Sequence, residues 1–472
     1  MFLSSDSKKI LETIKKEKVA FVDLRFTDTQ GLFHHFTLNA SAFNETIIQN
    51  GLVFDGSSLN GWQPIDDSDL LLVPDLSHTF MDPFSEDATL VVFCTIKDPV
   101  HQTPYIFDPR STALKAEEHL KNSGIADTAY FGPEPEFFVF DDIKFNTSPL
   151  KSFYHITASE RAPACSDCSS IDMHHGHRPQ HKGGYLPLPP IDSGHEIRSE
   201  MLKYLERVGV KTEKHHHEVA SNQHELGFEF STLVRTADNL QLLKYVVHNV
   251  ATFHGKTATF MPKPLFNDNG NGMHIHQSLW HKNAPLFSGE QYANLSDFAL
   301  YYIGGILHHA PALNAFTNPT TNSYKRLVPG YEAPVIRSYS ARNRSAAIRI
   351  PHVTSDKARR IEIRFPDPAA NPYLALAATL MAGLDGIKRK ISPSSPKEKN
   401  WYEEDLSHDK ENYLATSLKE ALDALENDHA FLTEGDVFHK KQIDSYIALK
   451  RQEIKVVEQT PHPQEFSLYY SL

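Results

Sequence analysis

Two glutamates stand two residues apart at the start of a very apolar segment, Glu134-Pro135-Glu136-Phe137-Phe138-Val139-Phe140. In an extended chain, residues i and i+2 project from the same face, so both carboxylates point the same way. The phenylalanines that follow require a buried strand, and buried carboxylates need partners. The two acids repel each other unless a cation lies between them. The segment therefore predicts a buried strand with a cation site at its mouth; the alternative is a solvated strand end.

Three further segments carry the same kinds of ligand. His215-His216-His217-Glu218 is followed by Glu225, and His274-Ile275-His276 repeats the two-residue spacing. In Arg360-Ile361-Glu362-Ile363-Arg364-Phe365, charged and apolar residues alternate, which predicts a strand with its charged side chains on an open face. Taken singly, each segment is typical of a salt-bridged surface. Together they offer oxygen and imidazole ligands, which favour hard divalent cations such as Mg²⁺ or Mn²⁺.

Eight arginines gather between positions 326 and 364 of a chain whose net charge is −12. An acidic chain is poorly suited to polyanions, so we expect no nucleic acid as partner. Guanidinium groups bind carboxylates and phosphates bidentately, which favours small anions instead. Divalent cations held by carboxylates beside arginines are the components of phosphoryl transfer from a nucleotide. The residues by themselves predict a metal-dependent, ATP-using enzyme that acts on an acidic small molecule.

Periodicity predicts an α+β chain with two parts of unequal size. A capped helix from Ser5 or Asp6 and strands 21–26 and 32–38 open a small first unit, which ends at the Pro- and Asp-rich passage 98–110. The expected elements beyond it are helices near 111–122, 196–208, 236–254, 295–316 and 372–388, and strands near 136–140, 214–219, 273–279, 346–350 and 360–365. Residues 145–185 and 391–412 lack periodicity and are expected to be long loops.

The composition indicates a cytoplasmic protein. No uninterrupted apolar stretch is long enough to span a bilayer, and the N-terminus lacks the order of a signal peptide, so we expect no membrane association. Three cysteines suit a reducing compartment. Cys165 and Cys168 precede several histidines and could bind zinc, but a single C-x-x-C in a polar segment is a weak signal, and solvated thiols are the favoured interpretation.

Longer motifs resemble a known family. The segments are Phe131–Phe138, Lys263-Pro264 with Asn269-Gly270-Asn271-Gly272-Met273-His274, and Asn318–Arg326. They resemble the signatures of the glutamine synthetases, and the resemblance runs from Asp55-Gly56-Ser57-Ser58 to the terminal Tyr469-Tyr470. It is closest to the bacterial class I enzymes of the adenylylated subgroup.

The resemblance implies a small N-terminal β-grasp domain, residues 1–105, and a large catalytic domain, residues 106–472, whose curved antiparallel sheet holds the metals. It also implies a homo-dodecamer of two stacked six-membered rings. Each active site would then lie between neighbouring subunits, so that Asp55 acts across an interface. The implied reaction joins ammonia to L-glutamate with ATP and two or three divalent cations, through γ-glutamyl phosphate.

The resemblance also implies roles for individual residues. The ligands of the tighter metal site are implied to be Glu136, Glu218 and Glu225, and those of the second site Glu134, His274 and Glu362. The implied ATP-binding residues are Phe230, His276, Ser278, Arg344, Arg349 and Arg360. Glutamate would be held by Asn269, Gly270, Arg326, Glu332 and Arg364. The implied catalytic residues are Asp55, Glu332 and Arg344, with Asp55 and Glu332 binding ammonium.

Members of the subgroup are regulated by transfer of AMP to one tyrosine, and Tyr402 occupies the matching position. The family usually has Leu before this Tyr and Asp-Leu-Pro after it, whereas Trp401 and Glu403-Glu404 flank it here. A regulatory adenylyltransferase is therefore an expected partner with altered recognition residues, and an ordinary loop tyrosine is the alternative.

Three other functions can be compared with these residues. A ligase that joins glutamate to an amine or polyamine would keep the metal ligands and arginines but alter the ammonium pocket, and Asp55, Glu332 and Tyr185 favour ammonia. A structural protein that has kept only the fold would have lost metal ligands, and all six are present. A two-metal hydrolase would not need so many arginines.

Overall fold

The computed structural model describes residues 5–160, 176–400 and 412–465. Tyr402, Cys165 and Cys168 lie outside these ranges. Within the described residues, no helix is long and apolar enough to cross a membrane.

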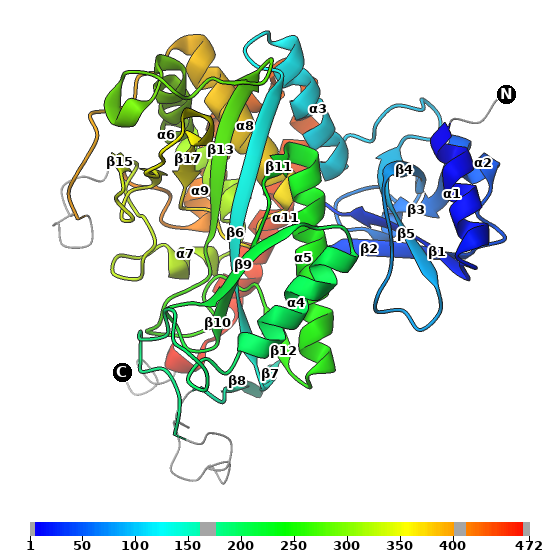
Figure 1. Cartoon of the computed structure of the whole chain (residues 1–472), viewed down its shortest axis with the longest axis horizontal. Helices are drawn as coiled ribbons and strands as arrows, with labels where there is room; N and C mark the ends of the chain where they lie inside the picture. Colours follow the sequence, from blue (N-terminus) through cyan, green and yellow to red (C-terminus); the bar gives the residue numbers. More distant parts are fainter. Residues whose placement is uncertain (1–4, 161–175, 401–411, 466–472) are drawn as a thin grey trace.

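The N-terminal part is a five-stranded sheet covered by helices. The strand order is β2-β1-β5-β4-β3, with β1 and β5 parallel and the other pairs antiparallel. Its elements are α1 (Ser5–Lys16), β1 (Phe21–Thr27), β2 (Phe33–Asn39), α2 (Glu45–Asn50), β3 (Leu52–Asp55), the 3-10 turn η1 (Gly56–Ser58), β4 (Asp69–Met81) and β5 (Thr89–Lys97). The helix, strands 21–26 and 32–38, and their pairing are as the sequence predicts. In Figure 1 this part lies beside the larger remainder of the chain.

Strand β1 is buried along almost its whole length rather than half-buried. Val22 and Leu24 lie in the core that also holds Ile10 of α1. On the opposite face, Arg25 and Thr27 contact helix α5 (Leu233–Phe253) of the larger part through Tyr245 and Gln241. Both faces are therefore covered, because the sheet also forms the contact with the rest of the chain.

The larger part is built on a ten-stranded sheet. Seven strands follow the order β15-β16-β17-β13-β6-β10-β9, while β11 and β12 pair with β6 and β14 pairs with β13. The strands are β6 (Thr128–Phe140), β9 (Thr212–His217), β10 (Gln223–Phe228), β11 (Ser231–Thr232), β12 (Thr257–Thr259), β13 (Met273–His281), β14 (Ala284–Pro285), β15 (Tyr339–Ala341), β16 (Ile348–Ile350) and β17 (Ile361–Ile363). The five strands predicted for this region are confirmed.

Helices pack behind this sheet. They are α3 (Pro109–Asn122), α4 (His195–Arg207), α5 (Leu233–Phe253), α6 (Asp297–Thr317), α7 (Ser323–Arg326), α8 (Pro372–Arg389), α9 (Leu418–Asn427), α10 (Ala430–Thr433) and α11 (Lys440–Gln459), with 3-10 turns η3 (Tyr292–Asn294), η4 (Asp356–Ala358) and η6 (Glu434–Asp436). The five predicted helices are confirmed, whereas α9 and α11 were not predicted. The architecture is the predicted α+β class.

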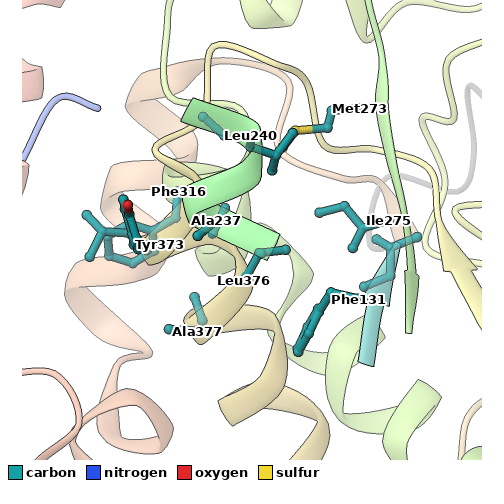
Figure 2. Close-up of a cluster of buried hydrophobic side chains, with 14 of the residues drawn as sticks. Phe131, Ala237, Leu240, Met273, Ile275, Phe316, Tyr373, Leu376 and Ala377 are labelled. Atoms are coloured by element: carbon teal, nitrogen blue, oxygen red, sulfur yellow. The ribbon is translucent and has the colours of Figure 1, made fainter. Parts of the chain in front are cut away.

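The core lies between the sheet and helices α5, α6 and α8. Figure 2 shows Phe131 of β6 and Ile275 of β13 facing Leu240 of α5 and Leu376 of α8. Helices α6 and α8 approach closely because glycines meet there: a Cβ added to Gly305 would lie 2.1 Å from the carbonyl oxygen of Ala382. This apolar layer makes one face of the sheet rigid and leaves the other for polar side chains.

The prediction of an irregular loop over 145–185 is wrong for its first part. Strands β7 (Asp142–Ser148) and β8 (Lys151–Thr157) form an antiparallel hairpin. Every residue of β7 is exposed. Ile143 and Phe145 alternate with polar residues in β7 but are exposed, and Ile156 at the end of β8 packs against the cluster that holds Phe138 and Phe140. The alternation is too short and too little buried to distinguish the hairpin from a loop.

Candidate active site

The two central strands of the sheet are strictly two-faced. On β6, Phe131 and Phe137 enter the core, while Glu134 and Glu136 lie at alternate positions on the other face. On β13, Ile275 enters the core between the histidines at 274 and 276. The acidic and imidazole groups predicted from the sequence therefore share one face, backed by the apolar layer.

Cross-strand register brings the predicted metal ligands together. Across the sheet, Glu225 lies opposite both His216 and Glu136. Further along, His274 lies opposite Glu134, and His276 lies opposite Glu362. Five strands thus contribute to one row of carboxylates and imidazoles.

The first group of metal-ligand atoms comprises His216, Glu218 and Glu225, whose atoms lie within 4.8 Å of one another. His216 was not predicted as a ligand, but its Nε2 lies 3.2 Å from Oε1 of Glu225. The predicted ligand Glu136 lies on the neighbouring strand, where its Oε2 accepts hydrogen bonds from Gln223 at 2.9 Å and Gly272 at 2.8 Å.

Electrostatics at this first group favour a cation. Burial and the neighbouring Glu225 raise the pKa of Glu136 to about 8, and burial with Glu136 and Glu225 holds the pKa of Glu218 well above its ordinary value. Among the described residues, the buried Oε1 of Glu225 accepts no well-aligned hydrogen bond, and its nearest basic groups are His216 Nε2 at 3.2 Å and Lys214 Nζ at 3.6 Å. Three crowded carboxylates, one of them with a loosely paired oxygen, fit a divalent cation bound by oxygen ligands.

The second group comprises Glu134, His276 and Glu362, again with ligand atoms within 4.8 Å of one another. The predicted ligand His274 lies slightly outside, with its Nδ1 3.9 Å from Glu134 and 3.9 Å from Glu362. Burial and the nearby Arg364 lower the pKa of His274 to about 4, so its imidazole is neutral at physiological pH. A neutral imidazole is the form that binds a metal.

Glu362 is enclosed by arginines, which corrects the prediction of an open strand face. Its side chain is fully buried, and its carboxylate accepts hydrogen bonds from Arg349 and, at 2.6 Å, from Arg364. Burial acts to raise its pKa, but Arg364 and neighbouring cations outweigh this and lower the pKa to about 2. The sequence pattern placed these charges on one face correctly, but the strands and loops that cover that face could not be read from it.

A cavity of about 400 Å³ opens beside the second group. Four of the residues predicted to bind nucleotide line it: Phe230, His276, Ser278 and Arg360. Arg344 and Arg349 do not line it; Arg349 contacts Glu362 instead, and the backbone carbonyl of Arg344 accepts a hydrogen bond from Arg364 at 3.0 Å.

Several residues of this cavity were missed by the sequence analysis. Tyr130 makes edge-to-face contacts with Phe230 at 5.3 Å and with Trp280 at 5.8 Å, forming an aromatic wall. Glu213 and Lys214 line the same space. The period-two pattern could have identified Tyr130 and Trp280, since they continue the faces of Glu134 and Ser278 on the same strands.

The residues predicted to hold glutamate adjoin both ligand groups: Gly270 contacts Gln223, which also donates to Glu136, and Arg364 contacts Glu362. Asn269 donates a hydrogen bond to Glu332 at 3.4 Å, and the carbonyl oxygen of Gly270 accepts one from Gln223 at 3.1 Å. Arg326 is buried and donates to the carbonyl oxygens of Arg364, Phe365 and Pro366. The structure therefore joins Asn269 to Glu332 and Arg326 to Arg364.

Glu332 lies in a segment held by lysines. Its φ is 58°, and the preceding Tyr331 ring lies under the ammonium groups of Lys263, at 3.9 Å, and Lys182, at 4.2 Å. The hydroxyl of Tyr331 also donates to Asn267 at 2.9 Å. Tyr185, the other residue expected near ammonium, meets His216 edge-to-face at 5.7 Å.

Asp55 is separated from all these groups within one copy of the chain. It ends strand β3 in the N-terminal part, away from β6, β9 and β13 (Figure 1). Its carboxylate is exposed and accepts hydrogen bonds from the backbone N–H and hydroxyl of Ser57 and from the hydroxyl of Ser58. The hydrogen bonds from Ser57 and Ser58 lower its pKa. Asp55 is thus a surface carboxylate that lies apart, within one copy of the chain, from the other residues predicted for the site.

Comparisons with known proteins cover nearly the whole chain. The family model described as "Glutamine synthetase, catalytic domain" matches residues 107–469, and "Glutamine synthetase, beta-Grasp domain" matches residues 18–99. The glutamine synthetase of Azospirillum brasilense is 56% identical over 468 residues, 99% of this chain and 100% of that protein. That of Escherichia coli K12 is 54% identical over 466 residues, 98% and 99% of the two chains. The solved Plasmodium falciparum glutamine synthetase superposes with a TM-score of 0.91 at 31% identity, covering 100% and 99% of the two chains.

Proposed function

The chain belongs to the glutamine synthetase family, and we propose how its residues carry out the family's reaction. The protein joins ammonia to L-glutamate in an ATP-dependent reaction that yields L-glutamine, ADP and phosphate. One observation supports the assignment of the site above all: two carboxylate and imidazole groups and an aromatic-lined cavity occupy the same face of one sheet.

Each ligand group would hold one divalent cation. Glu136, Glu218 and Glu225 would bind the first, with His216 beside them, and Glu134, His274 and Glu362 the second, with His276 beside them. The buried Oε1 of Glu225, which accepts no well-aligned hydrogen bond, and the raised pKa values of Glu136 and Glu218 support this assignment. Because most of the ligands are carboxylates, Mg²⁺ or Mn²⁺ fits better than a softer metal.

ATP would enter the cavity beside the second group. The aromatic wall with Phe230 offers a stacking surface for the base, while His276, Ser278 and Arg360 approach the phosphates. Arg344 and Arg349 would add positive charge at the phosphate end. When bound, the divalent cations offset the negative charge of the phosphates.

Glutamate would lie between Asn269-Gly270 and the pair Arg326 and Arg364, which would hold its carboxylates. So oriented, its γ-carboxylate attacks the γ-phosphorus of ATP, ADP leaves, and γ-glutamyl phosphate forms, with Arg344 stabilising the charge of the transferring group. Asp55 and Glu332 would bind ammonium and accept one of its protons. The resulting ammonia attacks the acyl phosphate and releases inorganic phosphate. The segment of Gly330 to Glu332 would cover the site and keep water from the intermediate.

We further propose that twelve copies assemble as two stacked rings, with Asp55 of one subunit completing the site of the next. The separation of Asp55 from the other site residues within one chain supports a shared site. Adenylylation of Tyr402 by an adenylyltransferase and a cytoplasmic location complete the proposal. Mass spectrometry of protein isolated under nitrogen excess tests the modification, and no AMP on Tyr402 would contradict it.

A coupled assay tests the proposed chemistry. Purified protein is supplied with ATP, glutamate, Mg²⁺ or Mn²⁺, and either ammonium or a polyamine, and ADP release is followed. We expect release with ammonium and little with the polyamine. ADP release with the polyamine alone would show that ammonia is not the substrate. It would also contradict the roles proposed for Asp55 and Glu332.

A further inference from the structure

A lysine stands between the two metal-ligand groups. Lys214, on β9, places its Nζ 3.4 Å from Oε1 of Glu134 and 3.6 Å from Oε1 of Glu225. Glu134 belongs to the second ligand group and Glu225 to the first. One ammonium therefore bridges carboxylates that we assign to two different cations.

The neighbouring strand is shaped to let this side chain reach the carboxylates. Lys214 lies opposite Gly227 of β10 in the strand register. A Cβ on Gly227 would lie 2.8 Å from Cγ and 3.0 Å from Cε of Lys214, so the lysine would have to shift from its present path. The missing side chain at 227 leaves a path along which the lysine crosses β10 toward the ligand groups.

The same ammonium also faces the nucleotide cavity. Lys214 and Gly227 line that cavity together with Phe230, Ser278 and Arg360. The lysine side chain is about half exposed, with 49% of its surface accessible, so it can move without unfolding the sheet around it. Lys214 thus pairs with the carboxylates of Glu134 and Glu225 and also lines the cavity proposed for the nucleotide.

Divalent cations and this ammonium would compete for the same carboxylate oxygens of Glu134 and Glu225. A cation that binds Glu134 or Glu225 repels Lys214 and removes its counter-charge. The anion that then enters the cavity is the phosphate chain of the nucleotide, and an ammonium is a common phosphate ligand.

We propose that Lys214 is a phosphate-contacting residue of this site that, in the absence of metal, bridges the two ligand groups as an internal cation. The inference rests on the proposed metal and nucleotide sites. It predicts opposite changes in two affinities: removing the ammonium should strengthen metal binding and weaken nucleotide binding.

The test compares Lys214→Met with Lys211→Met in the full-length assembled protein. Lys211 is the matched control, because it stands three positions earlier and pairs with Glu229 at 3.0 Å instead of with a ligand group. Free Mn²⁺ is followed by electron paramagnetic resonance without nucleotide, and ATP affinity is measured by calorimetry at saturating Mg²⁺. Lys214→Arg serves as the charge-conserving variant.

We expect Lys214→Met to bind Mn²⁺ about two- to fivefold more tightly, as loss of a partly exposed ion pair allows. We expect it to bind ATP about tenfold more weakly, as loss of a charged phosphate contact implies. Lys211→Met and Lys214→Arg should stay near wild type in both measurements. A merely structural lysine would not tighten metal binding when removed.

The outcomes separate this inference from the proposed function. Normal Mn²⁺ and ATP binding by the wild type, with Lys214→Met unchanged in either measurement, overturns the role of Lys214 alone. Mn²⁺ binding that Glu225→Gln leaves intact overturns the metal assignment and the inference together.

Discussion

Arg110 and Asp238 form two parallel hydrogen bonds, each 3.0 Å long, at the contact between the two parts of the molecule. Asp238 lies on α5 and also accepts hydrogen bonds from His78 of β4 at 2.9 Å and from Tyr373 of α8 at 2.6 Å. Arg110, on α3, additionally donates to Asp75 of the N-terminal sheet at 2.7 Å. Four elements are thus connected through one buried carboxylate.

Removal of Arg110 should therefore destabilise the protein strongly. Arg110→Ala leaves Asp238 charged and buried with only His78 and Tyr373, and breaking such a pair costs about 3 to 5 kcal/mol. Thermal unfolding at fixed protein concentration measures the change. The control is Arg451→Ala, whose exposed pairs with Asp423 and Glu426 should contribute less than about 1 kcal/mol. Equal shifts for the two variants would contradict the buried connection.

The same carboxylate predicts a pH dependence. Burial alone would raise the pKa of Asp238, but Arg110 and His78 lower it from 3.8 to about 2. Because the folded-state pKa is below the unfolded value, this stabilisation is complete above about pH 4 and is lost as the pH falls toward 2. The difference in melting temperature between wild type and Asp238→Asn should be constant from about pH 6 to 5 and should narrow by about pH 3. A difference in melting temperature that widens on acidification would contradict a lowered pKa for Asp238.

Residues that share a strand face were predictable from the sequence, because a period of two is visible in any single segment. Glu134 with Glu136 and His274 with His276 were found in this way, and the motif resemblance supplied their proposed partners. His216 and Lys214 were not found as site residues. Whether these two side chains reach the site depends on which residues of β10 lie opposite them. The register between two strands cannot be determined from the residue pattern of either strand alone.

The Asp238 contacts show the same limit at larger scale. They join positions 78, 110, 238 and 373, and each residue alone reads as an ordinary polar side chain near a helix or strand. The β7–β8 hairpin escaped prediction for a different reason: β7 is exposed throughout and only the end of β8 is partly buried, so few of its residues mark a buried face.

Glu160 should position a metal ligand without binding metal itself. Its Oε2 accepts hydrogen bonds from His217 Nε2 at 2.9 Å and from the N–H of Asn222 at 2.5 Å, and the other ring nitrogen of His217 donates to the carbonyl oxygen of Glu218 at 2.7 Å. Burial lowers the pKa of His217, but Glu160 outweighs this and raises it. The backbone of Glu218 is therefore fixed through an imidazolium anchored on Glu160.

Glu160→Ala should weaken Mn²⁺ binding by about ten- to a hundredfold, the usual effect of losing a residue that orients a ligand. Glu160→Gln keeps one side-chain oxygen that can accept the hydrogen bond from Asn222, and it should recover part of the affinity. Circular dichroism must show an intact fold in both variants. Mn²⁺ affinity that stays at the wild-type value in Glu160→Ala would rule out the positioning role.

Removal of metal should lower stability, and the effect of Glu218→Gln on stability should have opposite signs with and without metal. Burial and mutual proximity raise the pKa values of Glu136 and Glu218, so the metal-free site costs free energy on folding whether these groups stay charged or take up protons. A bound cation removes this cost, and binding contributes about 2.7 kcal/mol of stability at a hundredfold excess over Kd. Glu218→Gln replaces one of these carboxylates by a neutral amide. It should melt higher than wild type in excess chelator and lower than wild type in saturating Mn²⁺. Scanning calorimetry under both conditions measures this, and a variant less stable under both would contradict the proposed cation site.

Asp55 and Glu332 give the most direct test of a shared active site. Asp55→Ala and Glu332→Ala should each nearly abolish glutamine formation while nucleotide still binds, because both residues are proposed to act on ammonium.

If Asp55 serves the neighbouring subunit, a mixed oligomer of the two variants contains sites built from an intact Glu332 on one subunit and an intact Asp55 on the next. In an equal random mixture about a quarter of all sites are of this kind, since each half is intact with a probability of about one half. Co-expression with two different affinity tags isolates the mixed assemblies, and ADP release coupled to ammonium measures their activity. Recovery to about a quarter of the wild-type rate is expected, whereas no recovery in a correctly assembled mixture would place both residues in the site of one and the same chain.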